Sequence, residues 1–126
     1  MALVVAACLA SPALADHGRN PVTTEQPDVV RRLLDAAQPI VVVDVRPGPD
    51  YRAAHVPGAR SVPRTELALR AHEIPQRGQV VVYSDTMFEA RWAYELLRSL
   101  GYRNVTILEG GLVGWSERGL PVERGP

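Results

Sequence analysis

The amino-acid sequence predicts an α/β domain with a mostly parallel central sheet. Three continuous runs of apolar and β-branched residues are typical of strands buried on both faces: Ile40 to Val45, Gln79 to Tyr83, and NVTIL at 104–108. Helical patterns separate these runs, and a chain that alternates strand and helix builds a parallel sheet. The 126 residues show one alternation pattern, so we expect a single domain.

The first fifteen residues, MALVVAACLASPALA, differ from the rest of the chain. A short apolar stretch that ends in Ala13-Leu14-Ala15 is the pattern of a secretory signal peptide, and it is shorter than the about 20 apolar residues that cross a bilayer. We therefore predict cleavage after Ala15 and a periplasmic or secreted bacterial protein without a membrane span. Two alternatives stay open: an ordinary apolar segment, and lipid modification of Cys8 in the box Val5-Ala6-Ala7-Cys8.

A polar arm is predicted at residues 16–26, and the globular domain at 27–124. Thr23 or Thr24 is the expected N-cap of a helix that has Pro27 in its first turn. The helix extends toward Pro39 on apolar residues at helical spacing, which are Val29, Val30, Leu33, Leu34 and Ala37.

The middle of the chain holds shorter elements. After the first strand, PGPDYRAAHVPG at 47–58 predicts a turn, a short helix and another turn. A short strand is expected at Ala59 to Val62, and a brief helix at Thr65 to Ala71.

The last third begins with a helix from Phe88 to Leu100, which stops at Gly101, a favoured C-terminal cap. Glu89 starts the buried face of this helix, and Arg91 lies on its solvent side. The other members of the buried stripe are Ala93, Leu96, Leu97 and Leu100. GGLVGWSERG at 110–119 predicts a final short helix.

Composition excludes several classes of function. The formal net charge is zero, so no basic field is expected to attract nucleic acid. Cys8 is the only cysteine, and its removal with the leader would leave no thiolate nucleophile, disulfide or cysteine-based metal site. We predict no cofactor and no metal site.

Three stretches resemble, in order and at family spacing, the signature segments of rhodanese domains: VVVDVRPGPDYRAAHVPGARSVP at 41–63, VVVYSDTMFEARWAYELLRSLGY at 80–102, and VTILEGGLVGWSERGLPVE at 105–123. The resemblance implies a sheet of about five parallel strands flanked by helices on both faces. It also implies a loop cysteine that takes sulfane sulfur from a donor such as thiosulfate, carries it as a persulfide and passes it on. That catalytic pattern resembles C-x-x-G-x-R.

The chain departs from this catalytic pattern at three positions. In an alignment without a gap, Ser84 stands at the position of the cysteine, Met87 at that of the glycine and Glu89 at that of the arginine. A serine hydroxyl ionises far less readily than a thiol and cannot form a persulfide. A carboxylate at position 89, together with Asp85, would repel an oxyanion. We therefore expect a rhodanese-like pseudoenzyme.

Each residue of this loop also has a structural interpretation. Asp85, Thr86 and Glu89 suit the start of a helix, because they cap its free N–H groups and complement its dipole. Met87 and Phe88 either form a partner-binding surface or fold inward and fill the vacated pocket. A further hypothesis is that the Glu89 carboxylate plugs that pocket from within.

Other candidate residues have ordinary explanations. Asp44 and Arg46 end a strand, where ligands often bind, but the resemblance implies that they brace neighbouring loops. Gly110-Gly111 is interpreted as a turn into a helix, since the G-x-G-x-x-G spacing of a phosphate loop is missing. Trp92 and Trp115 are expected to pack against other residues rather than to bind a ligand.

Three functions stay open. The leading hypothesis is a binding or accessory module that contacts an unidentified protein partner through the altered loop. The second is an enzyme of another class, in which Ser84, Asp85 and Glu89 serve hydrolysis or hold a metal. The third is a sulfurtransferase that works with a thiol-bearing partner. The sequence places none of the three histidines beside the loop serine: His17, His55 and His72.

Overall fold

The structure is a computed structural model, and it describes residues 21–126. The predicted signal peptide, Cys8, His17 and the first part of the polar arm lie outside the described residues. The elements follow along the chain as β1 (Thr24–Glu25), α1 (Pro27–Asp35), β2 (Ile40–Asp44), α2 (Gly48–Ala53), β3 (Arg60–Ser61), the 3-10 helix η2 (Arg64–Glu66), α3 (Leu67–Arg70), the 3-10 helix η3 (Ala71–Glu73), β4 (Gln79–Tyr83), α4 (Met87–Ser99), β5 (Val105–Leu108) and α5 (Gly111–Glu117).

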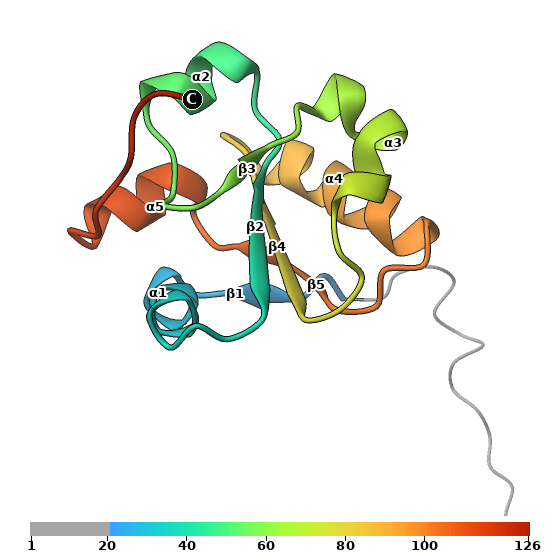
Figure 1. Cartoon of the computed structure of the whole chain (residues 1–126), viewed down its shortest axis with the longest axis horizontal. Helices are drawn as coiled ribbons and strands as arrows, with labels where there is room; N and C mark the ends of the chain where they lie inside the picture. The colour runs from blue at the N-terminus through green and yellow to red at the C-terminus, as the bar shows by residue number, and fades with distance from the viewer. Residues whose placement is uncertain (1–20) are drawn as a thin grey trace, which may run out of the picture.

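Five strands form one sheet in the order β1-β5-β4-β2-β3, and all neighbouring strands are parallel (Figure 1). The predicted five-stranded parallel sheet is therefore confirmed. Parallel strands end at the same edge of a sheet, so the segments that follow β2, β4 and β5 gather at one end of the molecule.

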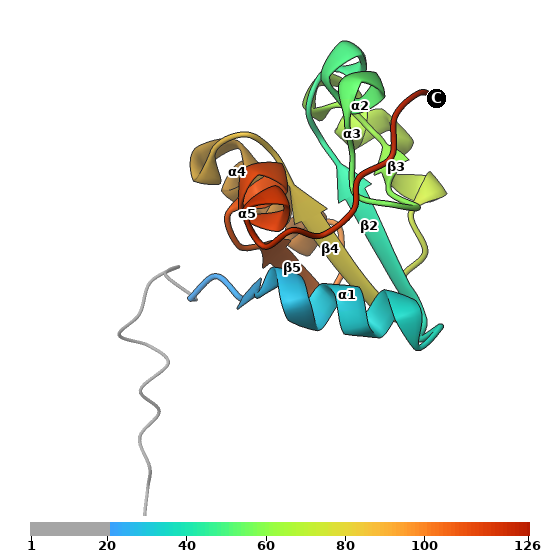
Figure 2. The ribbon, with the colours of Figure 1, turned by 90° about the vertical axis from the view of Figure 1, so that its left-hand side faces the viewer.

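Side chains that alternate along the strands pack into two cores, one on each face of the sheet. Val80 and Val82 of β4 lie in the core that α4 covers, whereas Val81 and Tyr83 lie in the core that includes Trp115 of α5. Figure 2 shows α1 and α5 together on the near side of the sheet. The prediction of helices on both faces is confirmed.

Strand β1 was not predicted. Thr24 pairs with Ile107 of β5, and the backbone N–H of Ile107 donates to the Thr23 carbonyl oxygen over 2.9 Å. The prediction that Thr23 or Thr24 caps α1 is wrong, because both belong to this edge pairing. Gln26 is the N-cap instead, and its side chain makes no capping hydrogen bond.

The buried stripe of α4 differs from the predicted one at its C-terminal end. Ala93 and Leu97 are buried as expected, but Leu96 is only half-buried and Leu100 is 45% exposed. Leu100 is the C-cap and lies past the last helical turn. The stripe is completed by Ala90 and Tyr94.

The two tryptophans have different environments. Trp115 is fully buried and its Nε1–H donates to the carbonyl oxygen of Pro121 over 2.7 Å, so the prediction that it packs against other residues is confirmed. Trp92 is 40% exposed, so it packs only in part. The guanidinium of Arg64 lies 5.7 Å from the centre of the Trp92 ring, a cation–π arrangement at the surface.

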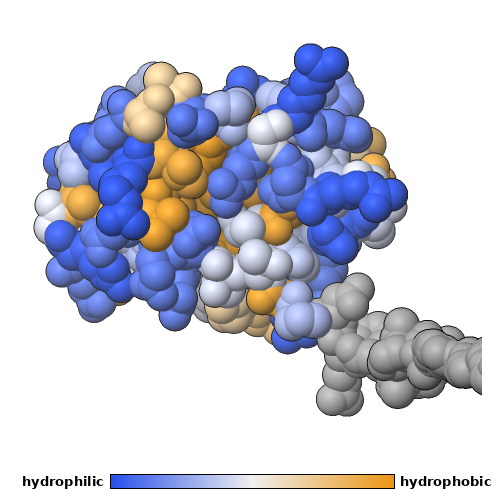
Figure 3. Space-filling model, turned by 90° about the horizontal axis from the view of Figure 1, so that it is seen from below, coloured by the Kyte–Doolittle hydropathy of each residue, from blue (hydrophilic) through white to orange (hydrophobic). Residues whose placement is uncertain are grey.

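The opposite end of the molecule, where the strands begin, is largely polar around an apolar patch on the side of α1 (Figure 3). A hollow of about 410 Å³ lies at the start of β4 and β5, lined by Thr23, Gly78, Gln79, Arg103, Asn104, Val105 and Thr106. It is remote from the loop that the sequence singles out. None of the helices within residues 21–126 has the length and apolar character needed to span a bilayer.

Candidate functional site

The candidate site is the loop that joins β4 to α4. The chain leaves the sheet at Tyr83 and enters the helix at Met87. Thr86 is the N-cap, with an extended backbone, and its hydroxyl accepts the N–H of Glu89 over 3.2 Å. Thr86 therefore caps the helix as expected, and the loop before it has a defined conformation.

Ser84 and Glu89 are hydrogen-bonded to each other. The Ser84 hydroxyl donates to Glu89 Oε2 over 2.8 Å, and Ser84 is only 4% exposed. The order Thr86-x-x-Glu89 is that of a capping box, in which the glutamate would return to the backbone N–H of the cap residue. Here the carboxylate bonds to the Ser84 hydroxyl instead, so the start of α4 is tied to the end of β4.

Next to Ser84 is a small hollow of about 110 Å³, lined by Ser84, Asp85, Thr86, Met87, Ala90, Ile107, Leu108, Gly110 and Gly111. Glu89 does not line it. Instead, Glu89 borders a second hollow of about 270 Å³, together with Val45, Pro47, Pro63, Arg64 and Thr65. The hypothesis that Glu89 plugs the pocket from within is therefore corrected: its carboxylate holds the Ser84 hydroxyl from the side.

The apolar residues of the loop face outward. Phe88 is 77% exposed and Met87 is 51% exposed. Met87 touches the edge of the small hollow, but Phe88 does not line it. The alternative in which both residues fold inward and fill the pocket is therefore wrong, because the capped helix begins at Met87 and directs Phe88 away from the sheet.

Gly111 lets α5 approach this loop closely. Its φ is +57°, and a Cβ atom built on it would lie 2.5 Å from the carbonyl oxygen of Ser84. No side chain is compatible with that distance, and positive φ is itself unfavourable for other residues. The Gly110-Gly111 pair is thus a turn and a close contact, as its interpretation as a helix-entry turn predicts.

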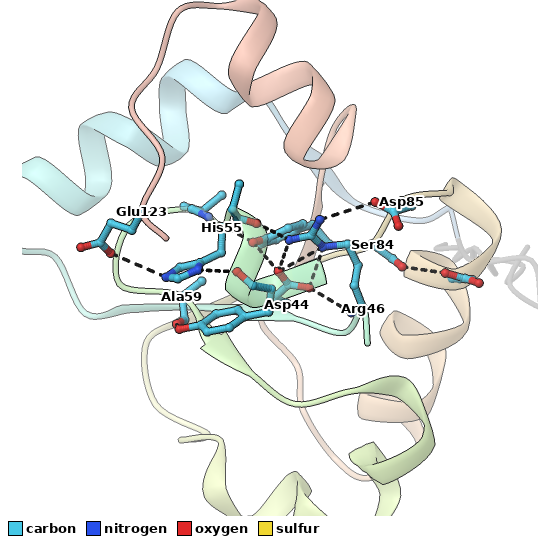
Figure 4. A network of polar contacts seen from close by, with 12 residues as sticks. Asp44, Arg46, His55, Ala59, Ser84, Asp85 and Glu123 are labelled. Atoms are coloured by element: carbon cyan, nitrogen blue, oxygen red, sulfur yellow. Dashed lines mark hydrogen bonds and ion pairs between the residues drawn. The ribbon is translucent and has the colours of Figure 1, made fainter. Parts of the chain in front are cut away.

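Asp44 and Arg46 form a buried ion pair below the loop (Figure 4). Arg46 Nη2 lies 2.6 Å from Asp44 Oδ2, and the same nitrogen donates to the carbonyl oxygen of Ala54 over 2.6 Å. Burial alone would lower the pKa of Arg46, but the hydrogen bonds and charge of Asp44 outweigh burial and raise the pKa above its usual value. Arg46 therefore stays charged and links β2 to the segment after α2.

Tyr83 completes this network. Its hydroxyl donates to Asp44 Oδ2 over 2.7 Å and accepts the backbone N–H of Val56 over 3.1 Å. Burial, and then the charge of Asp44, raise the pKa of Tyr83 far above its usual value, so the phenol keeps its proton. Sequence reasoning did not identify Tyr83 as a partner, since 39 residues separate it from Asp44.

Asp85 is the charged residue of the loop that reaches this network. Its Oδ1 lies 3.7 Å from Arg46 Nη1, and its side chain remains 55% exposed. Figure 4 shows the Arg46 guanidinium between Asp44 and Asp85. The Arg46 cation is thus shared by two carboxylates.

His55 is engaged away from the loop serine. His55 Nδ1 lies 2.7 Å from the carbonyl oxygen of Tyr51, and the two rings stack with centres 3.7 Å apart. His55 and Glu123 exchange two backbone hydrogen bonds of 2.9 Å, which fasten the C-terminal segment to the loop after α2. Sequence reasoning missed Glu123, because no local pattern marks such a bridge. His72 lies in η3.

The described part of the chain contains no cluster of three or more His, Cys, Asp or Glu side chains suited to hold a metal ion. What the site offers is a buried hydroxyl on a carboxylate, a shared cation, and two exposed apolar side chains.

Comparison with known proteins identifies relatives of this chain. A family model described as a Rhodanese-like domain matches residues 26–118. A sulfurtransferase of Allochromatium vinosum is 30% identical over 92 residues, covering 73% of this chain and 85% of that protein. An HTH-type transcriptional regulator of Mycobacterium tuberculosis is 38% identical over 88 residues, covering 68% of this chain but only 38% of the regulator.

Solved structures agree with the family model. The thiosulfate sulfurtransferase from Pseudomonas aeruginosa superposes with a TM-score of 0.77 at 30% identity, over 83% of this chain and 21% of that one. The Alr3790 protein from Anabaena gives a TM-score of 0.76 at 30% identity, over 80% of this chain and 92% of that one. Sequence and fold together show that the chain belongs to the rhodanese-like domain family.

Proposed function

We propose that this chain is a rhodanese-like binding or accessory domain that does not transfer sulfur by itself. One observation carries the proposal: the side chain at the junction of β4 and α4 is the hydroxyl of Ser84, hydrogen-bonded over 2.8 Å to the Glu89 carboxylate. Sulfur transfer needs an atom that ionises readily and forms a persulfide, and a serine hydroxyl does neither. Residues 21–126 contain no cysteine.

The charges around Ser84 support the same proposal. Asp85 and Glu89 flank the hydroxyl, so an anionic sulfur donor such as thiosulfate would meet two carboxylates. Arg46 is buried against Asp44 and is not free to bind an anion. Arg91 pairs with Glu95 over 3.2 Å on the exposed face of α4.

The exposed tip of the loop supports a contact role. Met87 and Phe88 present two large apolar side chains to solvent. They follow Ser84, which stands at the position that the resemblance gives to the catalytic cysteine. Grouped apolar side chains at a surface are typical of protein–protein contacts. In this proposal the loop is retained as a recognition surface for a partner protein.

The proposed location is the periplasm or the exterior of a bacterial cell, supported by the leader pattern of residues 1–15. Intact mass measurement on the protein recovered from a periplasmic fraction tests this. A mass that starts at Asp16 is expected. Retention of the full leader in the cytoplasm would contradict the proposal, and a lipid-sized mass increase at Cys8 would favour anchoring.

A thiosulfate:cyanide assay tests the loss of sulfur transfer. The purified protein and its Ser84→Ala variant should both give the rate of a buffer blank. The triple change Ser84→Cys, Met87→Gly and Glu89→Arg should gain measurable activity, because it supplies the sulfur atom, an open loop and a cation together. Ser84→Cys alone should gain little, since the Glu89 carboxylate would oppose ionisation of the thiol. Wild-type turnover that Ser84→Ala abolishes would overturn the proposal.

A second candidate is a small-molecule enzyme that uses Ser84 to Glu89. The names of the relatives favour a sulfurtransferase-type reaction, and the hydrogen bond from Ser84 to Glu89 favours an oxygen nucleophile with a carboxylate base. Hydrolysis of 4-nitrophenyl esters that requires both Ser84 and Glu89 would establish the oxygen-nucleophile version.

A further inference from the structure

A groove lies between the candidate loop and α5. It has a volume of about 380 Å³ and is lined by Arg46, Asp85, Leu112, Val113, Ser116 and Glu117. We call it the α5 groove. It is separate from the small hollow beside Ser84, and Asp85 borders both.

The α5 groove has a negative net charge. Arg46 is the cation at its floor, but Asp44 lies 2.6 Å from that guanidinium and balances it. Asp85 shares the same guanidinium at 3.7 Å, and Glu117 adds a third carboxylate to the lining of the groove. Three carboxylates and one guanidinium therefore meet at this groove, and together they carry three negative charges and one positive charge. The four residues are Asp44, Asp85, Glu117 and Arg46.

The base that follows Glu117 in the chain is engaged by other side chains. Arg118, the residue after α5, bonds to Asp28 and to the side chain of Gln26. Glu117 forms no ion pair with any residue in the range 21–126. An anionic occupant would therefore be repelled, whereas a cationic one would find two carboxylates.

Part of the lining of the groove is apolar. Val113 is 62% exposed, and Leu112 lies half-buried beside it. Shortly after Asp85 in the chain, Met87 and Phe88 are 51% and 77% exposed. Exposed apolar side chains thus occur both in the lining of this negative groove and in the loop segment that follows Asp85. This combination suits the long side chain of Arg or Lys, whose methylene stem packs on apolar surface while its charged head reaches a carboxylate.

Building on the proposed binding function, we propose that this face recognises a cationic and apolar segment of a partner protein. An Arg or Lys side chain enters the α5 groove, with its stem on Val113 and its head between Asp85 and Glu117. A bulky apolar side chain of the same segment packs on Phe88. A small diffusible amine would satisfy the carboxylates but would leave Val113 and Phe88 uncovered, so charge and apolar exposure together favour a polypeptide.

The test uses a displayed library of random 12-residue peptides, selected on the purified chain. Peptides that also bind the Asp85→Lys, Glu117→Lys double variant are removed. The expected survivors carry Arg or Lys next to a bulky apolar residue. Their affinity should fall at least about fivefold in Asp85→Asn, Glu117→Gln and should weaken with added salt, because exposed charge pairs are screened.

Two matched variants make this test specific. Glu95→Gln removes an exposed acid on α4 that pairs with Arg91, and it should leave peptide affinity unchanged. Phe88→Ala should weaken binding by about tenfold or more, since aromatic anchors dominate such contacts. A peptide whose cation is changed to Glu should lose binding to wild type and regain it with Glu117→Lys.

Several results would overturn the inference: no selected peptide, selected peptides without an excess of Arg or Lys, affinity unchanged in Asp85→Asn, Glu117→Gln, or spermidine that binds as tightly as the peptides. Binding that depends on Phe88 but not on the acids would overturn the partner chemistry and leave the binding function in place. The proposed function fails separately, through thiosulfate:cyanide turnover that requires Ser84.

Discussion

Arg46→Met removes the cation from a carboxylate that water does not reach. Asp44 is fully buried and accepts from the backbone N–H of Arg46, from its Nε and Nη2, and from the Tyr83 hydroxyl. The variant keeps the backbone and tyrosine donors but loses the positive charge. It also leaves the carbonyl oxygen of Ala54 without its 2.6 Å donor. Removing one partner of a buried ion pair costs about 3–5 kcal/mol.

This loss is a large fraction of the stability of a small domain, which is about 5–15 kcal/mol. With a urea dependence of about 1–3 kcal/mol per molar, the unfolding midpoint should fall by roughly 2 M. Urea unfolding followed by circular dichroism measures it. Arg70→Met is the matched control, because Arg70 pairs with Glu66 and Glu73 on the exposed surface at 3.0 and 2.9 Å. Surface pairs contribute about 0–1 kcal/mol, so its midpoint should barely change.

If Arg46→Met and Arg70→Met lowered the urea unfolding midpoint equally, the reasoning would be refuted, because burial would then not distinguish the two ion pairs. A further variant sharpens the test. Asp44→Leu combined with Arg46→Met leaves no unpaired charge, so it should be more stable than Arg46→Met alone. If the double variant is less stable than the single one, the unpaired Asp44 carboxylate is not the cause of the loss.

Three other predictions follow from the same region. Gly111→Ala should lower the free energy of unfolding by about 1–3 kcal/mol more than Gly119→Ala does. Both glycines have positive φ, but only a Cβ at Gly111 would meet the Ser84 carbonyl oxygen. Equal decreases in the free energy of unfolding, measured with urea, would contradict the close contact. Thr86→Ala should cost about 1 kcal/mol by removing the cap of α4, while Thr86→Ser should cost less; an unchanged midpoint for the alanine variant would exclude the capping role. Because burial and then Asp44 raise the pKa of Tyr83, the unfolded chain loses this proton first, so the stability it contributes is complete below pH about 10 and declines at higher pH. In the Tyr83→Phe variant, the urea midpoint should therefore decline less steeply with pH in the alkaline range. An unaltered dependence of the midpoint on pH would contradict the contribution of Tyr83.

Much of the fold could be predicted from the sequence, because the signals for it are local. The apolar runs at 40–45, 79–83 and 104–108 correspond to β2, β4 and β5, and all three lie at the centre of the sheet. Such strands are buried on both faces, so every residue carries the signal. The cap at Thr86 and the turn at Gly110-Gly111 were also predictable, since each depends on residues within one helical turn.

Only the tertiary structure could reveal the partners of the site residues. Strand β1 has two residues and no pattern of its own; it exists because the edge of β5 offers backbone partners. The sequence does not distinguish the environments of Trp92 and Trp115. Only the position of each helix on the sheet decides that Trp92 is exposed and Trp115 is buried.

The sequence by itself determined the three central strands and the helix that follows Ser84, and it determined that the loop at Ser84 has no thiol. The tertiary structure decided that Glu89 holds the Ser84 hydroxyl, that Asp85 shares the Arg46 cation, and that Asp85 and Glu117 face one groove. The physical reason is that periodicity is a property of neighbouring residues, whereas these contacts depend on the order in which distant strands pair. That order brings the ends of β2 and β4 and the start of α5 to one edge of the sheet.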